Sequence, residues 1–140
     1  MAGYSQTPLP QKLGIKDGMS VALIDAPDGF MRLLGELPEG VRFSPAARKP
    51  GLTLWFVRSR RDHEKRLARI LELAEHGHIW TIWPKLTSAL ASDISETYIR
   101  NVSLHAGLVD FKVCAVDDTW SGLKLAKRKP PVRTAVSRKP

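Results

Sequence analysis

Polar and charged side chains follow three apolar segments of the sequence, in short bends at residues 25–29, 85–88 and 117–122. Carboxylates accept hydrogen bonds from ligand hydroxyl groups, a lysine ammonium binds anionic groups, and an indole ring stacks on other rings. If each bend follows a strand of one mainly parallel sheet, all three lie at its carboxyl edge, where open α/β sheets usually bind ligands. The candidate ligand-binding residues are therefore Asp25, Asp28, Gly29, Lys85, Ser88, Asp117, Trp120 and Ser121.

Structural roles explain several of the same residues. Asp28 is well placed to cap a helix, Asp117 and Asp118 are common turn residues, and Lys85 can pair with one of these carboxylates. Spacing specifies no general base, nucleophile pair or set of metal ligands, so we predict no catalytic residue and no metal site. The sequence also contains no glycine-rich phosphate-binding motif, and no cofactor is predicted.

A first group of basic residues, Arg58, Arg60 and Arg61, follows an apolar segment and forms a candidate basic patch. Arginine suits phosphate and carboxylate groups because its guanidinium donates two parallel hydrogen bonds. Asp62 and Glu64 neutralise part of this charge, which favours the simpler interpretation of a solvated helix start.

A second group of basic residues lies in the tail at residues 127–140, which holds six of the 22 basic residues and none of the 14 acidic ones. The net charge of +8 therefore falls to +2 for the rest of the chain. We expect a disordered tail that contacts nucleic acid only weakly and without sequence preference. Its cations are Lys127, Arg128, Lys129, Arg133, Arg138 and Lys139.

Residues 77–85 predict the central strand of the fold. Ile79, Trp80, Ile82 and Trp83 make this segment apolar on both faces, which is typical of a strand covered by helices on each side. The proline that follows them ends the strand, because it has no N–H to donate to a sheet.

Further strands and helices alternate along the chain. Residues 10–13 predict a short helical turn. Asp28 predicts the start of a capped helix that includes Leu33 and Leu37, and Ser59 predicts the start of a helix that ends at Gly77. Asp93 or Ser95 predicts the start of a third helix. The other strands are predicted at residues 19–24, 41–44, 52–57, 109–116 and 123–126.

This alternation predicts an α/β fold with three layers, Rossmann-like, with a mainly parallel sheet of about six strands and a C-terminal antiparallel hairpin. Residues 1–18 form an N-terminal arm, residues 19–126 a single domain and residues 127–140 the basic tail. We expect the hairpin strand at residues 123–126 to lie at an edge of the sheet. There it could pair with a second copy of the chain, so the oligomeric state stays open.

Several sequence blocks resemble a bacterial family catalogued as a domain of unknown function. The resemblance spans about residues 4–126 and implies a compact bacterial domain with a variable tail, but no activity, cofactor or catalytic residue. The blocks are residues 4–5, 8–9, KLGIK at 12–16, 26–27, 29–30, 34–35, 37–38, WPK at 83–85, GLVD at 107–110, KVCAVD at 112–117 and WSGL at 120–123.

The layout is also similar to the core of S-adenosylmethionine-dependent methyltransferases. The similarity covers the entry at residues 13–18 into the first strand, the loop at 75–77 before the central strand, and the closing hairpin. The methyltransferase turn after the first strand needs glycines, whereas this turn contains Pro27. The second strand ends at Ser44 rather than at an acidic residue that would hold ribose hydroxyls.

We expect a non-catalytic or regulatory module that binds an anionic small molecule or a protein partner at the carboxyl edge of its sheet. One alternative is a shortened methyltransferase-like or nucleotide-using enzyme, with S-adenosylmethionine as its cofactor. Another is a nucleic-acid accessory protein that acts through the tail. No segment approaches the roughly 20 apolar residues that a membrane span needs, so we expect no membrane association and a cytoplasmic protein.

Overall fold

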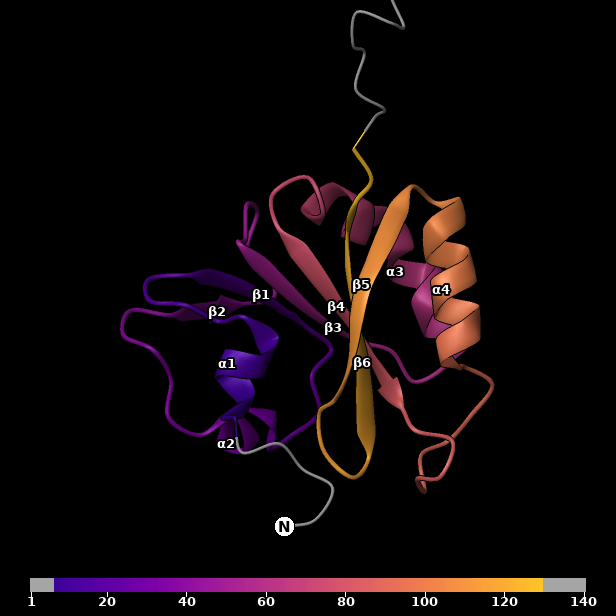
Figure 1. Ribbon diagram of the computed structural model, residues 1–140, viewed down its shortest axis with the longest axis horizontal. Coiled ribbons are helices and arrows are strands. Elements are labelled where there is room, and N and C mark those ends of the chain that lie inside the picture. Colours follow the sequence, from indigo (N-terminus) through magenta and orange to yellow (C-terminus); the bar gives the residue numbers. More distant parts are fainter. Residues whose placement is uncertain (1–6, 130–140) are drawn as a thin grey trace, which may run out of the picture.

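A computed structural model describes residues 7–129, so the predictions for residues 1–6 and for Arg133, Arg138 and Lys139 lie outside the described part (Figure 1). Its elements, in chain order, are α1 (Leu9–Leu13), β1 (Ser20–Ile24), α2 (Phe30–Leu34), β2 (Arg42–Ser44), β3 (Leu52–Phe56), α3 (Arg60–Leu73), β4 (His78–Pro84), α4 (Glu96–His105), β5 (Leu108–Ala115) and β6 (Trp120–Lys127).

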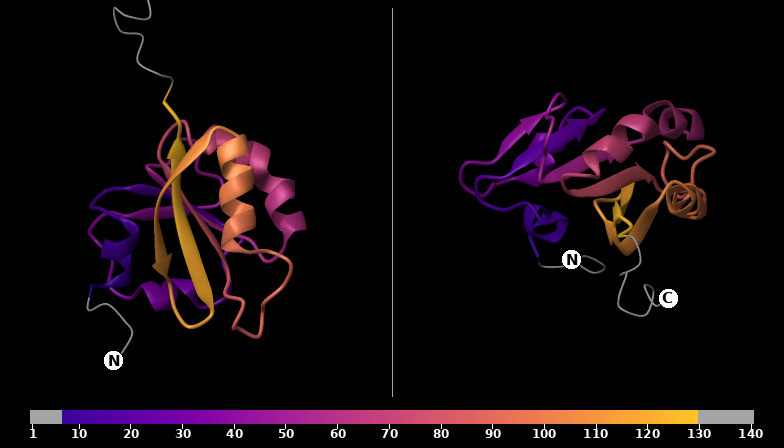
Figure 2. Two further views of the ribbon diagram at one scale, coloured as in Figure 1. Left: turned by 45° about the vertical axis from the view of Figure 1, so that its right-hand side comes forward. Right: turned by 90° about the horizontal axis from the view of Figure 1, so that it is seen from above.

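The six strands form one sheet in the order β2-β1-β3-β4-β6-β5. Strands β2, β1, β3 and β4 are parallel to one another, and β6 is antiparallel to both β4 and β5. The longer helices α3 and α4 cover one face of the sheet, and the short helices α1 and α2 lie on the other (Figure 2). The predicted three-layer α/β fold with a mainly parallel sheet and a C-terminal hairpin is confirmed.

Strand β4 is the buried central strand that the sequence predicts. Residues Ile79 to Pro84 are all buried, and β4 pairs with β3 on one side and β6 on the other. Its two tryptophans enter opposite layers: Trp83 packs in the core beneath α3 and α4, and Trp80 packs in the core on the α1 and α2 face. The indole nitrogen Nε1 of Trp80 donates to the Leu13 carbonyl oxygen at 2.8 Å, which fixes α1 on the sheet.

The prediction that the last strand lies at a sheet edge is wrong. Strand β6 begins at Trp120, three residues earlier than expected, and inserts between β4 and β5. The hairpin turn is correspondingly tighter, because Asp117 Oδ1 accepts hydrogen bonds from the backbone N–H groups of Thr119 and Trp120. The edge of the sheet on this side is therefore β5.

The helix after β1 is shorter than its apolar spacing predicts. It spans five residues and begins after Gly29 without a side-chain cap, so the predicted capping role of Asp28 is wrong. The helix ends at Gly35, whose φ of 74° and ψ of -141° favour glycine, and Leu33 is 41% exposed. Ser59 and Ser95 cap α3 and α4 by accepting from the backbone N–H groups of Asp62 and Tyr98.

Of the residues described, the longest helix is α3, with 14 residues. No helix in this range is long and apolar enough to cross a membrane.

At the end of β6, the Lys127 ammonium pairs with Glu75 at 2.6 Å, and Arg128 donates from its guanidinium to the Leu104 carbonyl oxygen at 3.0 Å. The first two residues of the predicted tail are thus bonded to the domain.

Gly77 does not end α3, which finishes at Leu73 with Ala74 as its C-cap. Gly77 instead lies where the loop before β4 crosses the loop before β3. A Cβ atom at this position would overlap the carbonyl group of Gly51 and lie 2.7 Å from the carbonyl oxygen of Pro50. The close approach of two backbones, rather than a special φ angle, requires glycine here.

We predict that Gly77→Ala lowers the free energy of unfolding by about 3 kcal/mol, because the added methyl group must push two backbone segments apart. Gly51→Ala is the matched control. Its Cβ would meet the Met19 side chain at an ordinary 3.4 Å, so a change of at most about 1 kcal/mol is expected. Urea denaturation of both variants measures the difference, and equal effects would contradict the explanation.

Candidate functional site

The three predicted bends meet at the carboxyl edge of the sheet. The backbone N–H of Lys85, just after β4, donates to the Thr119 carbonyl oxygen in the β5–β6 turn at 2.8 Å. The bend after β1 faces the same turn across a hollow of about 220 Å³. The hollow is lined by Pro27, Asp28, Gly29, Phe30, Leu33, Asp117 and Trp120.

An aromatic cluster forms the floor of this edge. The rings of Phe30 and Phe56 meet edge to face at 4.8 Å, and those of Phe56 and Trp120 at 5.3 Å. Trp120 is only 5% exposed. Its indole therefore acts as a wall of the hollow, and stacking on a ligand ring, the role expected from sequence, would require the cluster to open.

A second hollow, of about 160 Å³, lies at the same edge between the end of β1 and the first two turns of α3. The Arg66 guanidinium binds Asp25 through two hydrogen bonds, of 2.9 and 3.1 Å. The carboxylate of Asp62 accepts from the backbone N–H of Arg58 at 3.0 Å. The residues around this hollow are Asp25, Phe56, Arg58, Asp62, Lys65 and Arg66.

The charges around the second hollow do not balance. Three cationic side chains face two carboxylates, and among residues 7–129 neither Arg58 nor Lys65 takes part in an ion pair. The Arg58 guanidinium lies 5.7 Å from the centre of the Trp120 ring, which lines the first hollow. Arg58 thus connects the two hollows, and the second hollow carries one surplus positive charge.

The other members of the predicted basic patch face elsewhere. Arg60 donates from Nε to the Asp93 carbonyl oxygen at 2.7 Å, and its guanidinium lies 4.4 Å from the centre of the Tyr98 ring. Arg61 is exposed on α3 and lines neither hollow. The patch is therefore divided, and only Arg58 joins the candidate ligand residues.

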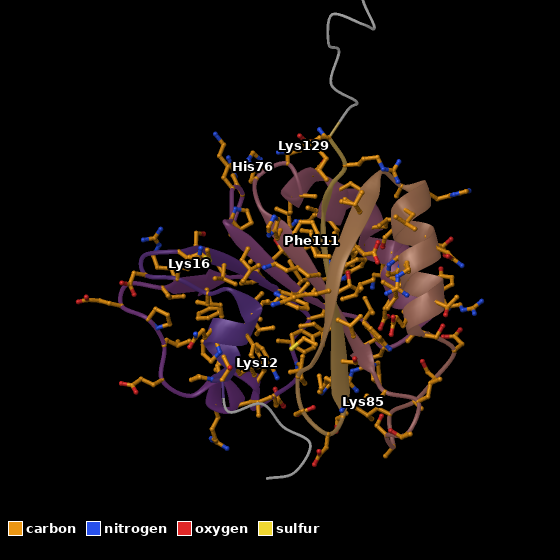
Figure 3. All side chains as sticks on the ribbon, in the orientation of Figure 1. Lys12, Lys16, His76, Lys85, Phe111 and Lys129 are labelled. Carbon is orange, nitrogen blue, oxygen red and sulfur yellow. The ribbon has the colours of Figure 1, made fainter. Side chains whose placement is uncertain are left out.

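Three predicted ligand residues lie near the edge but line neither hollow. Lys85 is at the carboxyl end of β4 (Figure 3). The Ser88 hydroxyl donates to the Lys85 carbonyl oxygen at 2.8 Å and so shapes the loop after β4. Ser121 lies within β6, paired with Trp83 and Ala115.

Sequence reasoning missed the residues that α3 contributes. Lys65 and Arg66 belong to a helix that follows β3, and its first two turns lie above the carboxyl edge. The available signal was their position five and six residues after the start of a helix that begins at that edge. Across residues 7–129, no three His, Cys, Asp or Glu side chains are grouped in a way that could hold a metal ion.

No family model matches the chain, and no curated protein matches it in sequence. Solved structures do match. A SAM dependent methyltransferase from Aquifex aeolicus is 14% identical with a TM-score of 0.56, covering 82% of this chain and 85% of that chain. A candidate type 11 methyltransferase from Sulfolobus solfataricus is 15% identical with a TM-score of 0.54, covering 89% and 92%.

The protein has a methyltransferase-like fold. At these identities the similarity establishes the fold alone, because one fold supports many functions. In this chain the residue directly after β1 is Asp25, which has a φ of 57°. The Arg66 guanidinium binds its carboxylate and so lies beside this bend. The resemblance to the bacterial family of unknown function stays a prediction.

A buried histidine lies behind the site, on the first turn of α3. His63 is fully buried, stacks on the Trp55 ring at 4.7 Å and meets the Tyr98 ring edge to face at 5.6 Å. Among the described residues, neither ring nitrogen has a hydrogen-bond partner. Burial among these rings lowers the pKa of His63 from 6.5 to about 4, since the charged form is poorly solvated there.

We predict that acid destabilises the fold through His63. The unfolded chain binds this proton below pH 6.5 and the folded chain only below about pH 4. Stability is therefore lost as the pH falls from 6.5 to 4, by up to about 3 kcal/mol. His63→Phe keeps the ring packing and removes the titration, so its unfolding free energy should vary less over this window. Parallel pH profiles of variant and wild type would refute the assignment.

Proposed function

We propose that the protein is a non-catalytic or regulatory module that binds a small anionic molecule at the carboxyl edge of its sheet. The observation that carries this proposal is the pair of cations, Arg58 and Lys65, which face the second hollow without an ion-pair partner among residues 7–129. A ligand carboxylate or phosphate supplies the missing negative charge. Guanidinium and ammonium groups bind these anions by charge-assisted hydrogen bonds.

The size of the two hollows limits the ligand. Their volumes of about 160 and 220 Å³ are below the roughly 300–1,000 Å³ of pockets for drug-sized ligands. A compact anion fits the second hollow. A larger ligand would also use the first, where Asp28 and Asp117 accept hydrogen bonds from its hydroxyl groups.

Two other occupants of this edge remain as competing proposals. The fold shared with two methyltransferase structures supports S-adenosylmethionine as a ligand of a shortened methyltransferase-like enzyme. Its adenosine would require the Phe56 and Trp120 cluster to open, since the two hollows are small. A protein partner that presents a carboxylate to Arg58 is the other proposal.

The anion proposal is tested by a thermal-shift screen with phosphate, small carboxylates, nucleotides and S-adenosyl compounds. It predicts that substitutions at this edge change the ligand-induced rise in Tm in opposite directions. A ligand at about one hundred times its Kd stabilises the fold by roughly 2.7 kcal/mol, which raises Tm by several degrees. Arg58→Gln or Lys65→Gln should reduce the shift. Asp25→Asn should increase it, because it frees the Arg66 guanidinium for the ligand and asparagine tolerates the left-handed φ of this position.

Lys49→Gln is the matched control, since Lys49 is exposed and lines neither hollow at this edge. Equal shifts in all four variants would contradict the proposed site. Calorimetric binding of S-adenosylmethionine with no response to simple anions would favour the methyltransferase-like alternative instead.

A further inference from the structure

One face of the sheet is only partly covered. Helices α1 and α2 lie over one part of it, and no helix within residues 7–129 covers β5 and the adjoining part of β6 on this side (Figure 1). We call this surface the open face and define it by Lys16, His78, Phe111, Lys112 and Lys124. None of these residues lines the two hollows at the carboxyl edge.

A β-bulge brings Phe111 onto the open face. The register of β5 against β6 shifts between Asp110 and Lys112. Asp110 turns toward α4, where its carboxylate binds Arg100 at 2.9 Å, whereas Lys112 lies opposite Lys124. The unpaired residue between them, Phe111, is 51% exposed and meets the His78 ring edge to face at 4.8 Å. An aromatic platform results on the open face, as bulges often re-aim a side chain.

Three lysines lie on the same face as this platform. Lys112 and Lys124 are directly opposite each other on β5 and β6, an arrangement that like charges disfavour. The pKa of Lys124 is lowered by partial burial and by the nearby charges of Lys112 and Lys16. Its ammonium lies 5.7 Å from the centre of the buried Trp80 ring. Among residues 7–129, these three lysines enter no ion pair, so their charge is available to a ligand.

We propose that the open face binds a single strand of nucleic acid, with bases stacked on Phe111 and His78 and phosphates bound by Lys16, Lys112 and Lys124. Exposed rings bordered by cations suit this partner, because unpaired bases stack on aromatic side chains while the backbone follows positive charge. A duplex offers no free base face to Phe111. Charge complementarity therefore argues for a nucleic acid, and the exposed rings argue for a single strand.

Further cations follow β6 along the chain, although Lys127, Arg128 and Lys129 themselves line a hollow with α3 and the end of α4 rather than the open face. Figure 3 shows Phe111 on the front of the sheet and Lys129 just beyond the end of β6. The sequence continues from there with Arg133, Arg138 and Lys139. These cations supply attraction that does not depend on sequence or on strandedness, whereas the platform supplies the preference for unpaired bases.

Fluorescence anisotropy of the full-length protein tests the proposal with labelled dT20, labelled U20 and a 20-base-pair duplex. We expect tighter binding of a single strand than of the duplex. Phe111→Ala should weaken single-strand binding about tenfold, the loss of one stacked base, and Phe111→Trp should retain it. Lys112→Gln with Lys124→Gln should reduce the slope of log affinity against log salt concentration by about 1.4, or 0.7 for each lost phosphate contact.

Two controls distinguish binding to the aromatic platform from non-specific binding. Leu86→Ala removes an exposed apolar side chain away from the open face and should leave binding unchanged. Replacing Arg133, Arg138 and Lys139 by glutamine should weaken binding to single strand and duplex alike, while the Phe111→Ala effect persists. The proposal is overturned if Phe111→Ala binds as well as the wild type, if the duplex binds as tightly as the single strand, or if only anionic vesicles bind.

Discussion

The double burial of β4 is the constraint on which the rest of the structure depends. Trp83 and Trp80 project from opposite faces of this strand into the two cores, and the second is fixed by its hydrogen bond to the Leu13 carbonyl oxygen. A strand that is apolar on both faces is stable only between two covering layers. The placement of α1, of the helix pair α3 and α4, and of the flanking strands β3 and β6 follows from this requirement.

The same arrangement concentrates charge at the carboxyl edge. Strand β3 ends beside β4, and α3 begins there, so Arg58 and the first turns of the helix are delivered to the edge that the bend after β1 also reaches. The aromatic rings of Phe56 and Trp120 fill the space below. This edge therefore consists of shallow charged hollows over a packed floor, although the fold itself is methyltransferase-like.

Much of the fold was predictable, because it depends on local patterns of apolar residues. The double apolar pattern of residues 79–83 predicts β4, and Ser59 and Ser95 predict the starts of two helices. The insertion of β6 between β4 and β5 was not predictable, since strand order depends on packing between distant segments. For the same reason, the sequence indicated that Asp117 and Trp120 share an edge with Asp25, but not that Trp120 is buried against Phe56 or that Arg66 binds Asp25.

The contact of Arg128 with the end of α4 fixes the end of β6 on the domain. Its guanidinium donates to the carbonyl oxygen of Leu104, and its backbone N–H donates to the carbonyl oxygen of Gly107. The departure point of the following residues is thus anchored beside the helix terminus. A partner that approaches this corner of the molecule therefore meets a backbone that two hydrogen bonds already hold in place.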